Sequence, residues 1–127
     1  FIADSQRSET KANAASFVDL RKNLQDGGID PASMPLVIQF NKRDLPEIRS
    51  DAEIDALAAR GREPVYKAVA LRGVGVVETL MGLLEITWRR LEAEHHLAEK
   101  FGVDPDPLLA QMREHLGVET PREGATQ

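Results

Sequence analysis

Three short apolar runs, each followed by a segment of helical periodicity, limit what this chain can fold into. The runs cover residues 1–3, 35–40 and 64–70. The middle run is largely continuous rather than alternating, which indicates a strand covered on both faces, as in a parallel sheet. We therefore predict an α/β fold in which helices flank a parallel sheet.

Two of the flanking helices are predicted from their apolar stripes. The first covers residues 7–26, and Asp4 and Ser5 are expected to cap its start. The last is predicted as one long helix over residues 76–100, with Trp88 in the stripe that faces the core. Together with the strands, these helices imply a sheet covered on both faces.

A shorter helix and a C-terminal appendage have more specific end signals. Ser50 and Glu53 have the spacing of a capping box, and Gly61 ends the helix that they begin. Beyond the main domain, an appended helix is predicted within residues 103–117, with Asp106 as its cap and a proline at its first position.

The domain organisation follows from these elements. We assign residues 1–102 to one α/β domain and residues 118–127 to a frayed tail after the appended helix. The chain starts at Phe1, in the middle of an expected strand and without a methionine, so we expect it to be the back part of a longer protein.

Composition excludes several classes of protein. A length of 127 residues suits one domain with a modest core. The formal charge of −5 argues against nonspecific nucleic-acid binding. No cysteine is present, so there is no disulfide framework or thiolate metal site, and the cytoplasm is the expected location. No apolar stretch is long enough to predict a transmembrane helix.

A polar cluster follows the middle strand, where ligands of open α/β sheets are bound. The cluster is Asn41-Lys42-Arg43-Asp44. The carboxylate of Asp44 can accept hydrogen bonds from both N1–H and the exocyclic amine of guanine, whereas adenine has neither donor on that edge. Asn41 can tie neighbouring loops together, Lys42 can lay its stem over the base, and Arg43 is expected to point to solvent. The cluster therefore predicts a guanine-binding site.

With these residues the sequence resembles the Ras-like small GTPases. Residues 35–45 are similar to the family's fifth strand and guanine-specificity motif, and Val69, Ala70 and Leu71 are similar to its second base-binding loop. The resemblance implies that the backbone N–H of Ala70 contacts guanine O6. The family's usual Ser-Ala-Lys is Val-Ala-Leu here, so a hydroxyl and a lysine stem are missing while the backbone contact needs neither.

Within that superfamily, residues 3–6, 20–24 and 39–46 look most like the bacterial Mgl-type GTPases of gliding motility and cell polarity. The likeness extends over roughly residues 1–92. It implies a partial P-loop GTPase fold, a GTP- or GDP-binding switch, and a Roadblock-type regulatory protein as a partner.

The groups that would hold the phosphates are absent from the sequence. Phosphoryl transfer needs a phosphate-binding loop and Mg²⁺ ligands, and no G-x-x-x-x-G-K-[ST] segment occurs in the chain. We therefore expect a fragment without catalytic or metal-binding residues. The resemblance implies GTP hydrolysis and Mg²⁺ binding only for the intact protein. Three strands with exposed edges are expected to be marginally stable or to depend on a partner.

The sequence also allows other interpretations. The half-domain could be a noncatalytic scaffold whose appended helix, residues 106–116, docks a partner. A receiver-like domain would need an acidic pair and a phosphorylatable aspartate at its strand ends. Asp4 and Asp44 come from adjacent strands, but the chain lacks the rest of that set. His95 is expected on a solvated helix face rather than in a metal site, and Ser5 has no histidine nearby that would make it a nucleophile.

Overall fold

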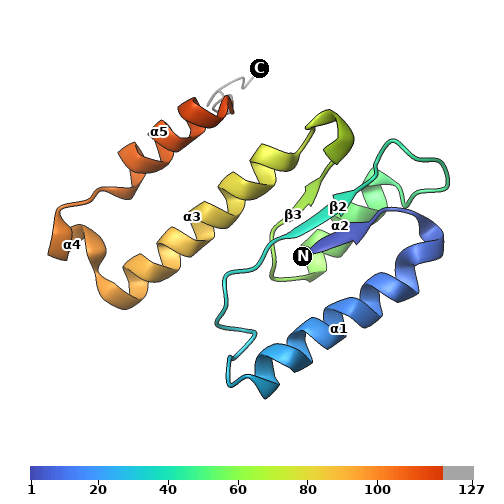
Figure 1. The fold of residues 1–127 in the computed structure, drawn as a ribbon, viewed down its shortest axis with the longest axis horizontal. Coiled ribbons are helices and arrows are strands. Elements are labelled where there is room, and N and C mark those ends of the chain that lie inside the picture. The colour runs from blue at the N-terminus through green and yellow to red at the C-terminus, as the bar shows by residue number, and fades with distance from the viewer. Residues whose placement is uncertain (119–127) are drawn as a thin grey trace.

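A computed structural model of the chain describes residues 1–118, and the predicted tail at 118–127 lies outside them except for its first residue. Three strands alternate with helices, and a helical appendage follows (Figure 1). The elements are β1 (Ile2–Asp4), the 3₁₀ turn η1 (Arg7–Glu9), α1 (Thr10–Asp26), β2 (Ile38–Asn41), α2 (Asp51–Arg60), β3 (Val65–Lys67), the 3₁₀ turn η2 (Ala70–Arg72), α3 (Val76–His95), α4 (Leu97–Phe101) and α5 (Pro105–Leu116).

The three strands form one parallel sheet in the order β1-β2-β3. This confirms the predicted parallel sheet, although the strands are shorter than expected. β2 begins at Ile38 rather than at residue 35, because Pro35 has no N–H to donate and the first ladder bond of β2 joins the Ile38 N–H to Pro64 O at 2.9 Å. β3 likewise covers only Val65–Lys67.

One face of the sheet packs against α1 and α2. Ala3 of β1, Phe40 of β2 and Ile54 of α2 form the buried cluster on this face. Phe17 extends the packing from α1, with its ring edge-on to Phe1 at a centroid distance of 5.2 Å. The apolar stripes of these helices therefore face the sheet as predicted.

The opposite face of the sheet packs against α3. The buried Gln39 side chain donates a hydrogen bond to Thr79 Oγ1 at 2.8 Å. Nearby, α3 approaches β3 so closely that a Cβ at Gly82 would overlap the Tyr66 hydroxyl. Because successive side chains of a strand point to opposite faces, Gln39 faces α3 while Phe40 faces α2. The sheet thus lies between two helical layers.

The capping box of α2 is present as predicted. Ser50 Oγ accepts a hydrogen bond from the Glu53 N–H at 3.2 Å, and the Glu53 carboxylate accepts one from the Ser50 N–H at 3.3 Å. The prediction for the first helix is wrong in detail. It starts with the 3₁₀ turn η1, neither Asp4 nor Ser5 caps it, and Ser5 is fully buried.

The last helical segment is broken where one long helix was predicted. His96 adopts a left-handed conformation with φ of 51°, which ends α3 and begins the short α4. The chain then turns back so that α5 packs along α3 (Figure 1). The cap of α5 is Asp104 instead of Asp106, since the Asp104 side chain accepts the Asp106 N–H at 3.1 Å.

Candidate functional site

The carboxyl ends of the three strands meet at one edge of the sheet, because the strands are parallel. Asp4 at the end of β1 pairs in register with Asn41 at the end of β2. The Arg43 N–H donates to Ala68 O, just beyond β3, at 3.1 Å. The residues predicted from the sequence to form a guanine site are therefore close together at this edge.

Asn41 ties the end of β2 to the loop after β3. Its Oδ1 accepts a hydrogen bond from the Ala70 N–H at 2.9 Å. This is the N–H that the family resemblance assigns to guanine O6, so a bound base would have to share or replace the bond to Asn41. Val69 is also engaged through its backbone, which forms a bridge with Val74.

Lys42 is held toward the end of β1. Its Nζ lies 2.8 Å from Asp4 Oδ2. The Lys42 ammonium and, after it, the Gln6 N–H lower the pKa of the Asp4 carboxyl, and Asp4 in turn raises the pKa of Lys42. Asp4, predicted as a helix cap, instead forms an ion pair with the lysine of the predicted guanine-binding cluster.

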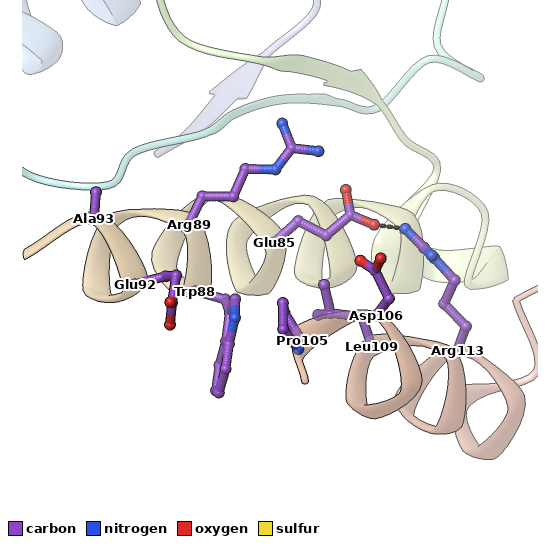
Figure 2. A pocket seen from close by; sticks show the side chains of 9 residues that line it. All are labelled: Glu85, Trp88, Arg89, Glu92, Ala93, Pro105, Asp106, Leu109 and Arg113. Atoms are coloured by element: carbon purple, nitrogen blue, oxygen red, sulfur yellow. Dashed lines mark ion pairs between the residues drawn. The ribbon is translucent and has the colours of Figure 1, made fainter. Parts of the chain in front are cut away.

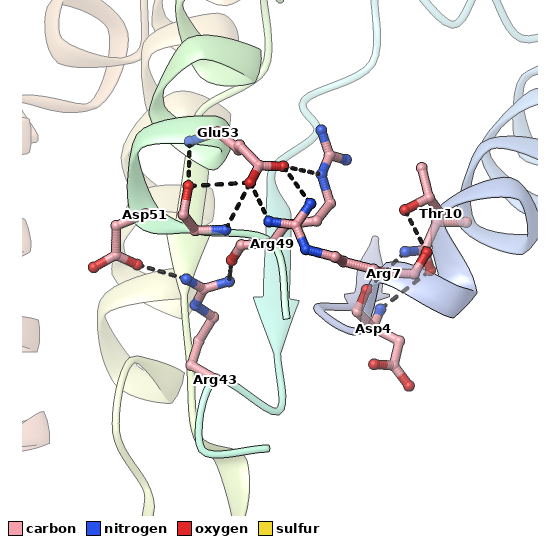
Figure 3. Close-up of polar contacts among 9 residues, drawn as sticks. Asp4, Arg7, Thr10, Arg43, Arg49, Asp51 and Glu53 are labelled. Carbon is pink, nitrogen blue, oxygen red and sulfur yellow. Dashed lines mark hydrogen bonds and ion pairs between the residues drawn. The ribbon is translucent and has the colours of Figure 1, made fainter. Parts of the chain in front are cut away.

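The prediction that Arg43 points to solvent is wrong. Its guanidinium donates to Arg49 O at 2.6 Å and to Asp51 Oδ1 at 2.6 Å, and its side chain is only 11% exposed (Figure 3). Lys42, the residue before Arg43, has a left-handed backbone with φ of 63°, and this turn sends the Arg43 side chain in a different direction from that of Lys42. Arg43 thereby anchors the motif loop to the N-terminus of α2.

Asp44 differs from its three neighbours in the motif. Its side chain is exposed, and within residues 1–118 it makes no side-chain hydrogen bond or ion pair, whereas Asn41, Lys42 and Arg43 are all engaged. Leu71, at the tip of the loop after β3, is 96% exposed. The site therefore offers a free carboxylate at the edge of the sheet, on a loop that is fixed elsewhere.

A second set of ion pairs holds the far side of the motif loop (Figure 3). The Arg7 guanidinium forms a bidentate ion pair with the Glu53 carboxylate, in which Arg7 Nη1 lies 3.0 Å from Glu53 Oε2. The Arg7 N–H donates to Glu47 O at 2.8 Å, and the Arg49 N–H donates to Ser5 O at 2.9 Å. The segment after β1 and the segment before α2 are thus joined beneath the site.

Glu53 is expected to make the stability of the protein depend on acid pH. The Glu53 carboxylate accepts hydrogen bonds from the Arg7 guanidinium and from the Ser50 N–H. These bonds, the one from Arg7 most, lower the pKa of Glu53 to about 2 from a usual value of 4.5. A lowered carboxyl pKa stabilises the folded state above pH 4.5, and the contribution is lost as pH falls toward 2.

The expected result is a fall in the urea midpoint between pH 5 and pH 3 that is smaller in Glu53→Gln than in the wild type. The exposed Glu114 supplies a matched control, Glu114→Gln, which should keep the wild-type pH dependence. An identical pH dependence of Glu53→Gln and wild type would contradict the assigned role of Glu53.

The chain is 40% identical over 92 residues to the mutual gliding-motility protein MglA of Myxococcus xanthus (strain DK1622). It is a partial relative of the Mgl-type, Ras-like small GTPases. This confirms the resemblance inferred from the strand-end motifs. The match covers 72% of this chain and 47% of the relative, so the chain spans about half the length of that protein. No protein-family profile matches the chain.

A separate hollow of about 490 Å³ lies between α3 and α5, away from the strand ends (Figure 2). Figure 2 shows Glu85 of α3 and Arg113 of α5 in an ion pair across the two helices. Trp88 lines the hollow, and its buried indole N–H has no hydrogen-bond partner among the described residues. The appended helix is therefore docked on the main domain by both charge and packing.

Within residues 1–118 no group of three or more histidine or acidic side chains gathers to hold a metal ion. None of the helices there is long and apolar enough to cross a membrane. His95, the histidine weighed as a metal ligand, is 57% exposed at the end of α3.

Two contributors to the site were missed by sequence reasoning. Asp4 was named for the wrong role, although its position directly after a strand is the signal that places it beside Lys42. Asn13 was not singled out, yet its side-chain amide bonds the backbone N–H and C=O of Asp4. Nothing in the local sequence indicates that contact, because it joins residues of two elements in three dimensions.

Proposed function

We propose that the carboxyl edge of the sheet binds the guanine base of GDP or GTP and that Asp44 selects it. The observation that carries this proposal is the free, exposed Asp44 carboxylate on a loop whose other motif side chains are held in place. Such an arrangement reduces the conformational entropy lost when the carboxylate binds a ligand.

The chemistry of the base gives the selectivity. A carboxylate has two acceptor oxygens and no donor, so it can pair with N1–H and the exocyclic amine of guanine in one plane. Adenine offers an unprotonated N1 on that edge, which a carboxylate repels. A hydrogen bond to a charged group contributes about 1.5–3 kcal/mol, so the net loss of one such bond with adenine predicts a preference for guanine of roughly tenfold to a hundredfold at this exposed site.

The remaining contacts would come from the loop residues named above. Lys42 would cover one face of the base with its methylene stem, Asn41 would approach N7, and Ala70 would present its N–H to O6. Val69 and Leu71 complete the second base-binding loop. These roles follow the family resemblance, and the proximity of Asn41 to Ala70 supports them.

The wider role is proposed from the same relationship. We propose that the longer protein to which such a chain corresponds is a GTP- or GDP-binding switch of gliding motility or cell polarity in the cytoplasm. GTP hydrolysis with Mg²⁺ and control by a Roadblock-type protein belong to that proposal. The sequence has no G-x-x-x-x-G-K-[ST] loop to hold the phosphates, and within residues 1–118 no cluster of metal-binding side chains is present.

Fluorescent mant-GDP and mant-ADP titrated against the full chain test the proposal. We expect tighter binding of mant-GDP by the wild type and loss of that preference in Asp44→Ala. Glu47→Ala, in the same exposed loop, is the matched control and should keep the preference. The same preference in the wild type and in Asp44→Ala would overturn the guanine assignment.

The rival function, a noncatalytic scaffold, depends on α5. In the structure α5 packs on α3 and is joined to it by the Glu85–Arg113 pair, so much of its apolar face is already in contact within the chain. This arrangement favours the nucleotide-binding proposal over partner docking through α5.

A further inference from the structure

Lys42 has an unusual backbone and a fixed side chain. Its φ of 63° places it in the left-handed region, which residues other than glycine occupy at a cost of roughly 1–2 kcal/mol. Such conformations persist where surrounding contacts hold them. The side-chain contact that holds Lys42 joins its Nζ to Asp4 Oδ2 at 2.8 Å, from the end of β2 to the end of β1.

Asp4 is itself held from three directions. Its Oδ1 accepts the Gln6 N–H at 3.0 Å, which leaves Oδ2 facing Lys42. The Asn13 amide accepts the Asp4 N–H at 3.1 Å and donates to Asp4 O at 2.7 Å. The Asp4 side chain is only 19% exposed. Independently of Lys42, the fold therefore fixes the backbone of Asp4 through Asn13 and one carboxylate oxygen through Gln6.

We propose that Asp4 is a positioning residue for nucleotide binding, which holds the Lys42 ammonium at the end of β1 so that the lysine stem lies ready to stack on the purine. The inference rests on the proposed function. A free lysine side chain has many rotamers, and ordering it on ligand binding costs entropy. With its ammonium fixed by Asp4, the stem has lost much of that freedom before the base arrives.

This role has a signature that differs from that of Asp44. A methylene stem contacts the face of a purine, which guanine and adenine share, whereas Asp44 contacts the edge, which they do not. Loss of Asp4 should therefore weaken mant-GDP and mant-ADP binding by the same factor and leave their ratio unchanged. The lysine of this ion pair is 51% exposed, and such pairs contribute up to about 1 kcal/mol, so the expected weakening is roughly three- to fivefold.

The test is a double-mutant cycle in the full chain, with mant-GDP and mant-ADP as probes. Asp4→Asn keeps an acceptor for the Gln6 N–H, and Lys42→Met keeps an unbranched stem without its charge. We expect Asp4→Asn to weaken binding in the wild-type background and to have no effect in the Lys42→Met background. Glu94→Gln, which removes the Arg90 ion pair on α3, is the control and should leave binding unchanged.

Three outcomes would overturn the proposal. The first is an Asp4→Asn variant that binds mant-GDP with wild-type affinity. The second is an equal loss of affinity from Asp4→Asn in the wild-type and Lys42→Met backgrounds, which would mean that Asp4 acts through the fold rather than through Lys42. In either case a wild-type preference for mant-GDP over mant-ADP would leave the guanine assignment standing. Absence of that preference in the wild type would overturn both proposals together.

Discussion

Replacing Gly75 by alanine is expected to destabilise the protein by about 2–5 kcal/mol, the sum of a strained backbone and a steric overlap. Gly75 precedes α3 with φ of 75°, a conformation that alanine adopts at a cost. A Cβ there would also overlap the Lys67 carbonyl oxygen at the end of β3 and lie 3.0 Å from Ala68 Cα. Backbone atoms cannot move aside as a side chain can, so β3 and α3 would have to separate.

The chain supplies a matched control two residues earlier. Gly73 has φ of 72°, yet nothing lies within 4 Å of where its Cβ would be. Gly73→Ala should therefore cost only the backbone term, roughly 1–2 kcal/mol. Urea unfolding followed by the fluorescence of Trp88 measures both variants. Equal midpoints for Gly73→Ala and Gly75→Ala would show that the close approach of Gly75 to β3 has no energetic consequence.

Much of the fold could be predicted because its signals are local. The capping box of α2 needs only Ser50 and Glu53 three residues apart along the chain, and both hydrogen bonds are present. The strand–helix alternation likewise needs only the apolar pattern. The break at His96 has no such signal, since neither glycine nor proline stands there. It is accompanied by a hydrogen bond of 2.9 Å from the Ala98 N–H to the Glu92 side chain.

The candidate site was predicted as a set of residues but not as a geometry. The positions of Asn41, Lys42 and Asp44 follow from the motif and its place after a strand. The direction of Arg43 does not, because it depends on the left-handed turn at Lys42 and on acceptors at, and just before, the start of a later helix. Contacts between separate elements are decided by the folded chain, and local pattern carries little information about them.

The largest effect on binding is expected from Asp44→Asn, which should change the preferred base and not merely weaken binding. Xanthine carries a carbonyl oxygen where guanine carries its exocyclic amine. An asparagine side chain can donate an N–H to that oxygen and accept N1–H with its own carbonyl. With the wild-type carboxylate, an acceptor oxygen of Asp44 would face this acceptor oxygen of xanthine, and the two would repel each other. The wild type should therefore prefer guanine and the variant xanthine.

The central claim, that Asp44 reads the base, is tested most directly by titrating mant-GDP and mant-XDP against the wild type and Asp44→Asn. The account predicts a reversal: wild type binds mant-GDP at least about tenfold more tightly than mant-XDP, and Asp44→Asn binds mant-XDP more tightly than mant-GDP. The same order of affinities in both proteins would contradict it, because the base would then be selected by something other than the side chain at position 44.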